Sequence, residues 1–430
     1  MHQDSRWTRA PVLRSTALLF LAAGAVALSS TGVIAGSKSS VPLSSSAPSV
    51  LPGGLGPDSY FLRMWGWGVD DGTSDFQVCT RDCQAGDWGS GVGQLYNPRG
   101  LALDPTGRVA VVDQYNYRVQ FFSADGAYLS QYGSSGPAEL QFGKPRDIAF
   151  DTSGNAYIAD TNNQRVQVID SSGTFVRTWG WGVDTGTPGL QTCTSSCQAG
   201  IQGSGNGQFY DPAGIFVTAA GHVWVADMRN NRLQRFDQYG TYQDQIGAGG
   251  SATLANPTDL ADDGQGNFVI LDEGNHRIVR RRMSDYGFVD MWGWGVLDGA
   301  SRLQVCTSSC QVGLQGNGEG QFGSITGVAV DRKRGLIYIS DVNNDRVNIF
   351  NTAGSYVGLW GSNGSAEGQF SHAAAVATDS SGHVYVTDEQ NNRVQKHFLG
   401  TLNIIVADSP VANPSALLAP PAHVFTASRW

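Results

Sequence analysis

The sequence predicts an all-β fold, a closed six-bladed β-propeller whose blades have four strands each. The hexapeptide Asp-x-x-Asn-x-Arg occurs six times, each time between two short runs of β-forming residues. Both alternating sets of side chains in these runs are largely apolar, so each sheet must be sandwiched between two neighbours. The Asp and Arg residues of the six copies are Asp113/Arg118, Asp160/Arg165, Asp227/Arg232, Asp272/Arg277, Asp341/Arg346 and Asp388/Arg393.

One unit shows how each blade is expected to form. Residues 145–151, 155–160, 165–169 and 174–179 have the residue types and lengths of four strands. Tight turns at Gly154 and Gly173 separate the first from the second strand and the third from the fourth. Four such short antiparallel strands predict one twisted sheet.

The two ends of the repeat region favour a closed ring over a solenoid, which would need atypical capping repeats at both ends. The pattern stops after Leu399, so the sixth unit lacks its fourth strand. Residues 59–68 closely match 173–182, which contain the fourth strand of a complete unit. The N-terminal strand is therefore expected to complete the last blade, which leaves no unpaired edge between the first and last blades.

The repeated Gly-Gln-Phe, Pro, Asp-x-x-Gly-Asn-x-Tyr-x-Ala-Asp, Asn-x-Arg-Val-Gln and Gly-x-Phe segments resemble the NHL repeat over about residues 59–399. The fourth unit departs from the pattern at Arg280–Arg282, and the fifth and sixth lack the Pro. The resemblance implies a six-bladed propeller. It also implies two known activities, since some NHL-like propellers are metal-dependent lyases or lactonases and others bind RNA.

The N-terminal 35 residues resemble a secretory signal, because Arg6, Arg9 and Arg14 precede an apolar run from Ala17 to Leu28. Cleavage is expected after Ala35, and the alternative is an uncleaved N-terminal anchor. Residues 36–58 are rich in Ser, Pro and Gly and predict a flexible linker, while residues 400–430 predict a C-terminal tail. The expected location is secreted or at the cell surface.

The charge of the chain argues against a nucleic-acid partner. The formal net charge is −9, whereas nucleic-acid-binding surfaces concentrate Lys and Arg. Export also fits RNA binding poorly. We expect a protein, peptide or glycan ligand and a monomeric state.

Three homologous insertions lengthen alternate junctions between units. They span residues 65–94, 179–208 and 292–321, and each contains Trp-Gly-Trp-Gly followed by a Cys-x-x-x-Cys pair. Each is expected on the same face as the Asp-x-x-Asn-x-Arg turns. The pairs Cys79/Cys83, Cys193/Cys197 and Cys306/Cys310 predict three small disulfide loops. A zinc site is the alternative, but each insert offers two thiols and no His, whereas zinc needs four ligands.

The Trp-Gly-Trp pairs have two interpretations. The first Trp of each pair is expected to pack between blades. The second, Trp67, Trp181 or Trp294, could equally pack or form an aromatic surface for a glycan or peptide.

The chemistry of the repeated motif favours a structural role. Asp can accept turn N–H groups, and Arg can reach the Asp in a charge-assisted fork. A ring of six Asp residues around the axis that binds metal or ligand is the alternative. Asp147, Asp259 and Asp263 lie in or at the ends of innermost strands, where solvated turns are favoured over a divalent cation site, for example for calcium.

No catalytic residues, metal ligands or cofactor are assigned from the sequence. We expect an exported recognition scaffold that binds a protein, peptide or glycan through the face with the three inserts. The alternative is a metal-dependent lyase or hydrolase, lactonase-like or amidating-lyase-like, acting at the mouth of the central channel. Whether the chain is an enzyme stays open, with the non-enzymatic interpretation favoured.

Overall fold

The computed structural model describes residues 59–247 and 253–399. The expected signal segment, linker and C-terminal tail lie outside the described residues. Within the described residues, no helix is long and apolar enough to cross a membrane.

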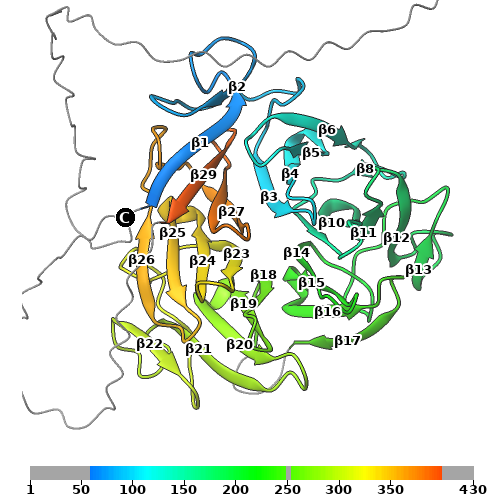
Figure 1. Ribbon diagram of the computed structural model, residues 1–430. Coiled ribbons are helices and arrows are strands. Elements are labelled where there is room, and N and C mark those ends of the chain that lie inside the picture. Colours follow the sequence, from blue (N-terminus) through cyan, green and yellow to red (C-terminus); the bar gives the residue numbers. More distant parts are fainter. Residues whose placement is uncertain (1–58, 248–252, 400–430) are drawn as a thin grey trace, which may run out of the picture. The chain divides into compact units, whose positions relative to one another are not determined.

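Six small antiparallel sheets form a ring, which confirms the six-bladed β-propeller (Figure 1). In each blade the first strand is the innermost and the last strand is the outermost. Blade 1 has β3 (Pro98–Leu103), β4 (Val109–Asp113), β5 (Arg118–Phe122) and β6 (Tyr128–Tyr132). Blade 2 has β9 (Asp147–Phe150), β10 (Ala156–Asp160), β11 (Arg165–Ile169), β12 (Phe175–Trp181) and β13 (Leu190–Cys193). Blade 3 has β14 (Pro212–Val217), β15 (Val223–Asp227), β16 (Arg232–Phe236) and β17 (Tyr242–Ile246).

The other half of the ring repeats this arrangement. Blade 4 has β18 (Pro257–Asp262), β19 (Asn267–Asp272), β20 (Arg277–Arg282), β21 (Phe288–Trp294) and β22 (Leu303–Cys306). Blade 5 has β23 (Ile325–Asp331), β24 (Leu336–Asp341), β25 (Arg346–Asn351) and β26 (Tyr356–Trp360). Blade 6 has β27 (Ala373–Thr378), β28 (His383–Asp388), β29 (Arg393–Leu399), β1 (Ser59–Trp67) and β2 (Phe76–Cys79). A parallel pair, β7 (Ser134–Ser135) and β8 (Gln141–Phe142), lies between blades 1 and 2.

The N-terminal strand closes the ring as expected. β1 pairs antiparallel with β29, from Ser59 opposite Leu399 to Gly66 opposite Arg393. The last blade is thus made from both ends of the repeat region. In each blade the innermost strand pairs with the strand that follows it in the chain.

The inserts add a fifth strand, which the sequence analysis did not predict. β2, β13 and β22 pair with the fourth strands of blades 6, 2 and 4. In blade 2 this pairing extends β12 to Trp181, two residues beyond its expected end at residue 179, because Trp181 lies opposite Leu190. The inner strand β9 begins two residues later than expected, after Pro145, which has no N–H to donate.

A hydrophobic cluster fills each of the six interfaces between neighbouring blades. Blades 2 and 3, for example, enclose Trp179, Val166, Phe209 and Phe236. Every blade is covered on both sides, which explains why both alternating sets of side chains in the strands are apolar.

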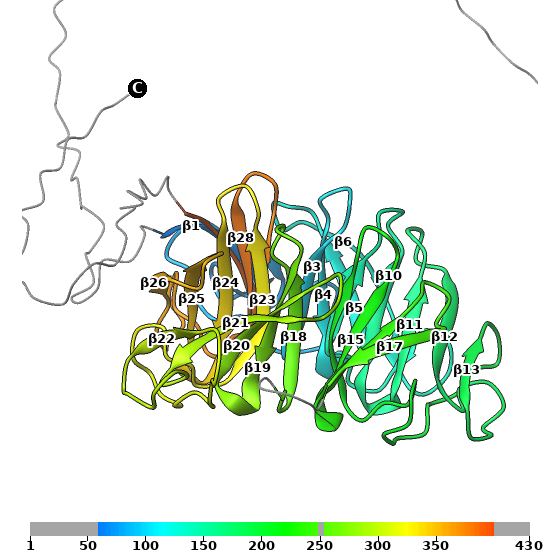
Figure 2. The ribbon, with the colours of Figure 1, turned by 90° about the horizontal axis from the view of Figure 1, so that it is seen from below.

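The two faces of the ring differ in what they carry (Figure 2). A short 3₁₀ turn joins the second and third strands of blades 1 to 5, and the motif residues surround it; the turns are η1 (Gln114–Asn116), η2 (Thr161–Asn163), η3 (Met228–Asn230), η4 (Glu273–Asn275) and η5 (Val342–Asn344). The inserts return over these turns, with Gly200 N donating to Asn163 O at 2.7 Å. We call this side the insert face and the opposite side, which bears the turns between first and second strands, the hairpin face.

Candidate functional site

The motif builds a buried polar network at each blade. In blade 2 the carboxylate of Asp160 accepts hydrogen bonds from Arg165 Nε at 2.8 Å, Gln167 Nε2 at 3.0 Å and Gly143 N at 2.6 Å. Asn163 Nδ2 donates to both carboxylate oxygens. Burial raises the pKa of Asp160, and the charge of Arg165 opposes that rise. The carboxylate of Asp160 is therefore occupied by hydrogen bonds that stabilise this turn, and the same holds for its equivalents.

All six Asp–Arg pairs form, and all six Asp side chains are fully buried. Five pairs have Nε–Oδ2 distances of 2.7 to 2.8 Å, and Arg346–Asp341 is longer at 3.5 Å. These Asp residues lie between the second and third strands of their blades, so the structure gives no ring of motif carboxylates at the axis.

The arginines also hold the inserts, a role that the sequence analysis missed. In the even-numbered blades, Arg393, Arg165 and Arg277 donate to the carbonyl that follows the second Cys of each insert. The acceptors are Gln84, Gln198 and Gln311, at 2.8, 2.9 and 3.0 Å. In the odd-numbered blades, the motif Arg binds carbonyls at the end of the preceding insert, as Arg118 does with Gly91 and Gln94. Each insert is thus fixed at two points by two different motifs.

The six cysteines lie in three pairs at disulfide distance, as expected. The S–S distances are 1.99 Å for Cys79–Cys83, 2.10 Å for Cys193–Cys197 and 2.01 Å for Cys306–Cys310. No free cysteine occurs among the described residues. Two of the disulfides pack with a few apolar side chains, such as Val183 and Phe175 beside Cys193, so these inserts have small cores of their own.

The two tryptophans of each Trp-Gly-Trp pair have different environments. Trp65, Trp179 and Trp292 are fully buried between blades. Trp67, Trp181 and Trp294 are half-buried and lie beneath the ends of their own inserts, with Trp294 Nε1 donating to Glu319 O at 2.9 Å. The second tryptophans stand on the outer strands of three separate blades, so the structure does not bring them together into one surface.

Exposed apolar side chains are concentrated in the inserts. In residues 59–247 and 253–399, eight of the eleven exposed large apolar side chains lie within the three inserts. They are Val78, Trp88, Val92, Ile201, Leu297, Val305, Val312 and Leu314. Trp88 is the most exposed of the eleven, at 67%. The sequence analysis did not single it out, although it differs from Gln202 and Gln315 at the equivalent positions.

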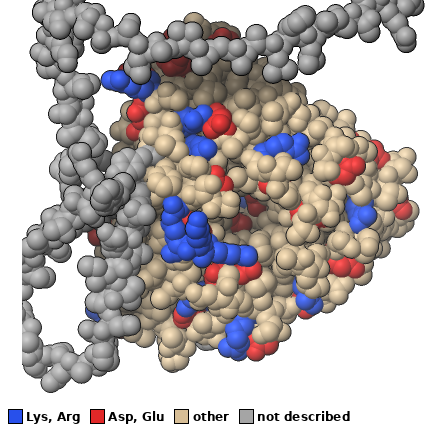
Figure 3. Space-filling view, viewed as in Figure 1, with Lys and Arg blue, Asp and Glu red and all other residues tan. Residues whose placement is uncertain are grey.

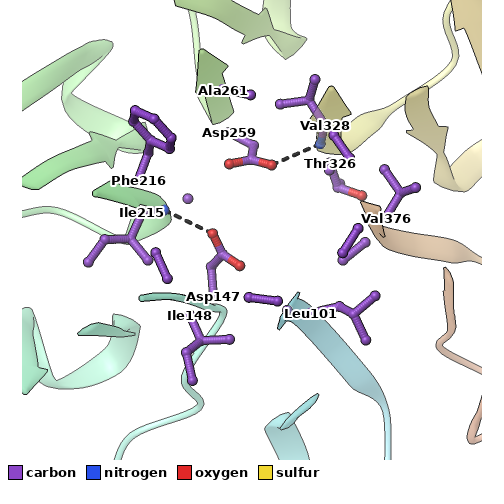
Figure 4. A pocket seen from close by; sticks show the side chains of 18 of the residues that line it. Leu101, Asp147, Ile148, Ile215, Phe216, Asp259, Ala261, Thr326, Val328 and Val376 are labelled. Carbon is purple, nitrogen blue, oxygen red and sulfur yellow. Dashed lines mark hydrogen bonds between the residues drawn. The ribbon is translucent and has the colours of Figure 1, made fainter. Parts of the chain in front are cut away.

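The central channel holds a second group of polar residues. The six innermost strands line a cavity of about 300 Å³, and the hairpin face is hollowed at its centre (Figure 3). Asp147 and Asp259 both project into this cavity (Figure 4). Asp147 Oδ2 accepts from Ile215 N at 2.9 Å and Asp259 Oδ2 from Val328 N at 2.9 Å, so each links its blade to the next.

The expectation of solvated turns for these two carboxylates is wrong. Asp147 stands in β9 and Asp259 in β18, both face the channel and not a turn, and burial raises the pKa of both groups. Repulsion by Asp147 raises the pKa of Asp259 further. Asp263 does lie in a turn, where its carboxylate accepts from Gln265 N and Asn267 N, but it is buried and not solvated as expected.

The residue at this level of the channel differs between even-numbered and odd-numbered blades, as the inserts do. The residues equivalent to Asp147 and Asp259 are Ala375 in blade 6 and glycines in blades 1, 3 and 5. A Cβ on Gly100 would lie 2.6 Å from Arg146 O, and one on Gly214 would lie 2.6 Å from Thr258 O. Only the even-numbered blades therefore have room for a side chain at this level. Among the described residues, no group of three or more His, Cys, Asp or Glu could hold a metal ion.

Four segments match the NHL repeat family, namely residues 95–122, 142–169, 209–236 and 370–396. Each runs from just before an inner strand to the third strand of the same blade. These are NHL repeats. The matched NHL blades have Gln120, Gln167, Gln234 and Gln395 two residues after the motif Arg. The two unmatched blades have Val279 and Asn348 there, although they keep the Asp–Arg pair.

Solved structures similar to this NHL propeller have low sequence identity. Virginiamycin B lyase from Staphylococcus aureus is 12% identical with a TM-score of 0.46, over 70% of this chain and 95% of that one. A gluconolactonase from Xanthomonas campestris is 13% identical with a TM-score of 0.43, over 71% and 87%. The WD40 repeats of RRP9 are 11% identical with a TM-score of 0.48, over 72% and 96%. These likenesses carry no argument for the function of this chain. No curated protein matches it by sequence.

Proposed function

We propose that this NHL propeller is an exported scaffold that binds a protein, peptide or glycan ligand through its insert face. The observation that carries the proposal is the concentration of exposed apolar side chains in the three inserts. The exposed apolar side chains recur on all three inserts and are rare elsewhere on the described surface, and exposed apolar surface that is concentrated in particular segments is typical of interaction sites.

The construction of the inserts supports the same function. Each insert is held by a disulfide, by a fifth strand and by two motif arginines. A surface that is fixed before binding loses little conformational entropy when the ligand arrives. The three disulfides are also consistent with an oxidising, extracytoplasmic location.

The test compares two sets of surface variants of the full chain. Val92→Asp, Ile201→Asp and Leu314→Asp together place one charge on each insert. Leu129→Asp and Tyr239→Asp place charges on exposed apolar residues outside the inserts and serve as the control. Glycan arrays and displayed peptide libraries are probed with wild type and both sets. We expect a ligand that wild type and the control bind and that the insert variant loses. A ligand bound equally by all three would contradict the proposal.

The channel carboxylates favour a second candidate function, a hydrolase or lyase that uses Asp147 and Asp259 as an acid–base pair. Two carboxyl groups with raised pKa values in one cavity suit proton transfer, and burial raises the pKa of Asp147 to about 7. The chain would be screened with chromogenic ester and lactone substrates. Activity that survives Asp147→Asn and Asp259→Asn would contradict this candidate.

A further inference from the structure

A row of aromatic side chains crosses the insert face from the first insert to blade 2. Trp88 lies beside Tyr96, with ring centroids 5.1 Å apart and an angle of 34° between the planes. Tyr96 meets Tyr115 edge to face, also at 5.1 Å. The ammonium group of Lys144 lies 4.6 Å from the centre of the Tyr115 ring. We call these four side chains the aromatic row.

The backbone holds the row in place through the blade 1 motif. Asp87 N donates to Trp67 O and Gly89 N to Leu95 O, so the residues on both sides of Trp88 are fixed. Asn116 of the motif donates to Gly89 O at 2.6 Å. Asp113 of the same motif accepts from Tyr96 N at 2.7 Å. The backbone around Trp88 is therefore held in place although 67% of the residue's surface is exposed to water.

The row is particular to one insert. The equivalents of Trp88 in the second and third inserts are Gln202 and Gln315, and Tyr115 is replaced by Arg229 in blade 3. Because the three inserts share their fold, the indole of Trp88 is not needed to build an insert. Trp88, Tyr96 and Tyr115 form one contiguous aromatic group at the surface, and such a group is typical of an interaction site.

The chemistry of the row indicates the ligand. The ring of Trp88 packs beside Tyr96 but is largely exposed, so it offers a flat apolar face that suits the C–H face of a sugar ring. Lys144 lies on the Tyr115 ring and makes no ion pair with a carboxylate of the described residues. Its positive charge at the end of the row favours an anionic ligand.

We infer that the aromatic row binds an acidic polysaccharide, with a sugar ring stacked on Trp88 and a carboxylate of the polysaccharide close to Lys144. This inference rests on the proposed function, because it names the ligand class for one part of the insert face. It assigns the stacking role to the first insert alone and leaves the second and third inserts free for other contacts.

The test uses purified full-length protein and two polysaccharides, alginate as the polyuronate probe and dextran as the neutral one. Binding is measured by calorimetry at low and high salt and by protection of tryptophan fluorescence from acrylamide. Trp88→Gln introduces the residue that the other two inserts already carry, so the fold is expected to be kept. Gln202→Ala, at the equivalent position of the second insert, is the matched control.

We expect alginate to bind more tightly than dextran and less tightly at high salt. Trp88→Gln should weaken alginate binding at least tenfold, Lys144→Gln should weaken it several-fold and reduce its salt dependence, and Gln202→Ala should leave it unchanged. Melting temperatures measured alongside should be equal for wild type and Trp88→Gln. If Trp88→Gln has a lower melting temperature than wild type, Trp88→Ala and Trp88→Phe are compared instead. Only Trp88→Phe should then bind alginate.

Three results would overturn the inference. They are unchanged alginate affinity in Trp88→Gln, equal affinity for dextran and alginate, and a proline-rich peptide that binds in a Trp88-dependent way while alginate does not. If alginate fails to bind but the charged insert variant still loses another ligand, only the aromatic row is refuted. If the charged insert variant still binds every ligand that wild type binds, the proposed function fails as well.

Discussion

Arg165 Nη1 donates a hydrogen bond to Gln198 O at 2.9 Å, while Nε of the same side chain is paired with Asp160. One guanidinium thus joins the turn inside blade 2 to the insert that leaves this blade. The insert face and the blades beneath it share their polar contacts.

Removal of Arg165 is expected to affect both. Arg165→Ala leaves the buried Asp160 without its charge partner, which costs on the order of 3–5 kcal/mol. We expect a lower midpoint in chemical denaturation and faster hydrogen exchange at residues of the second insert. Arg177→Ala, which removes an exposed contact to Gln238 O, is the control and should change stability little. Equal midpoints for wild type and Arg165→Ala would contradict the structural role.

The disulfide of each insert closes a loop with a sequence separation of four residues. Loop-closure entropy for so short a loop corresponds to about 2 kcal/mol. Cys193→Ser with Cys197→Ser should therefore destabilise the second insert while the ring stays folded. Denatured, unreduced wild type should show no free thiols by thiol titration, and six free thiols would disprove all three bonds.

His397 should make the propeller sensitive to acid. Its ring is buried among Phe61, Trp360 and Phe370, and burial lowers its pKa from 6.5 to about 3. The unfolded chain then binds a proton between these two pH values and the folded chain does not. Stability must fall as pH drops below about 6.5, by up to about 5 kcal/mol near pH 3.

The His397→Phe variant tests this dependence, because Phe122, Phe236 and Phe350 occupy the equivalent position in other blades. Melting temperatures of the variant and of wild type should converge near pH 8 and diverge towards pH 4, with the variant more stable. Parallel curves over this range would show that His397 does not carry the effect.

The channel carboxylates should act in the opposite direction. Burial raises the pKa of Asp147 from 3.8 to about 7, so the folded state prefers the protonated form. Stability from this group is complete below about pH 4 and is lost as pH rises towards 7. Asp147→Asn keeps an acceptor for Ile215 N but carries no charge. We expect it to raise stability at pH 8, by about 4 kcal/mol at most, and to change little at pH 4.

Asp259→Asn gives the corresponding check on the coupling between the two groups. Either substitution removes their mutual repulsion, so the stabilisation by the double variant should be smaller than the two single effects combined. Additive effects would show that the two carboxylates titrate independently.

The sequence predicted the fold well because the fold is repeated. Six copies of one motif fixed the blade number, and the match between residues 59–68 and 173–182 located the closing strand. The motif arginines were placed correctly beside their aspartates, five residues away in the chain. Their contacts with Gln84, Gln198 and Gln311 join distant parts of the chain, and no local spacing indicates them.

The candidate site was less predictable for two physical reasons. Asp147 and Asp259 face the channel because a glycine on a neighbouring inner strand, such as Gly100 or Gly214, leaves space beside their backbone, which depends on the assembled ring.

The aromatic row requires Trp88, Tyr96 and Tyr115 to meet, although Tyr115 lies in a separate turn of the chain from the other two. A comparison of the three inserts would have revealed Trp88, since Gln202 and Gln315 align with it. The fifth strands also had a signal in the repeated Phe/Leu-Gln-x-Cys segments.

The pairing of Ser59 with Leu399 determines how the molecule can be presented to its surroundings. This pair closes the end of blade 6 that lies away from the motif, so the described propeller begins and ends on its hairpin face. A fusion partner, surface support or affinity tag joined next to either residue starts from that side. The three inserts then point outward and stay accessible, whichever end carries the attachment.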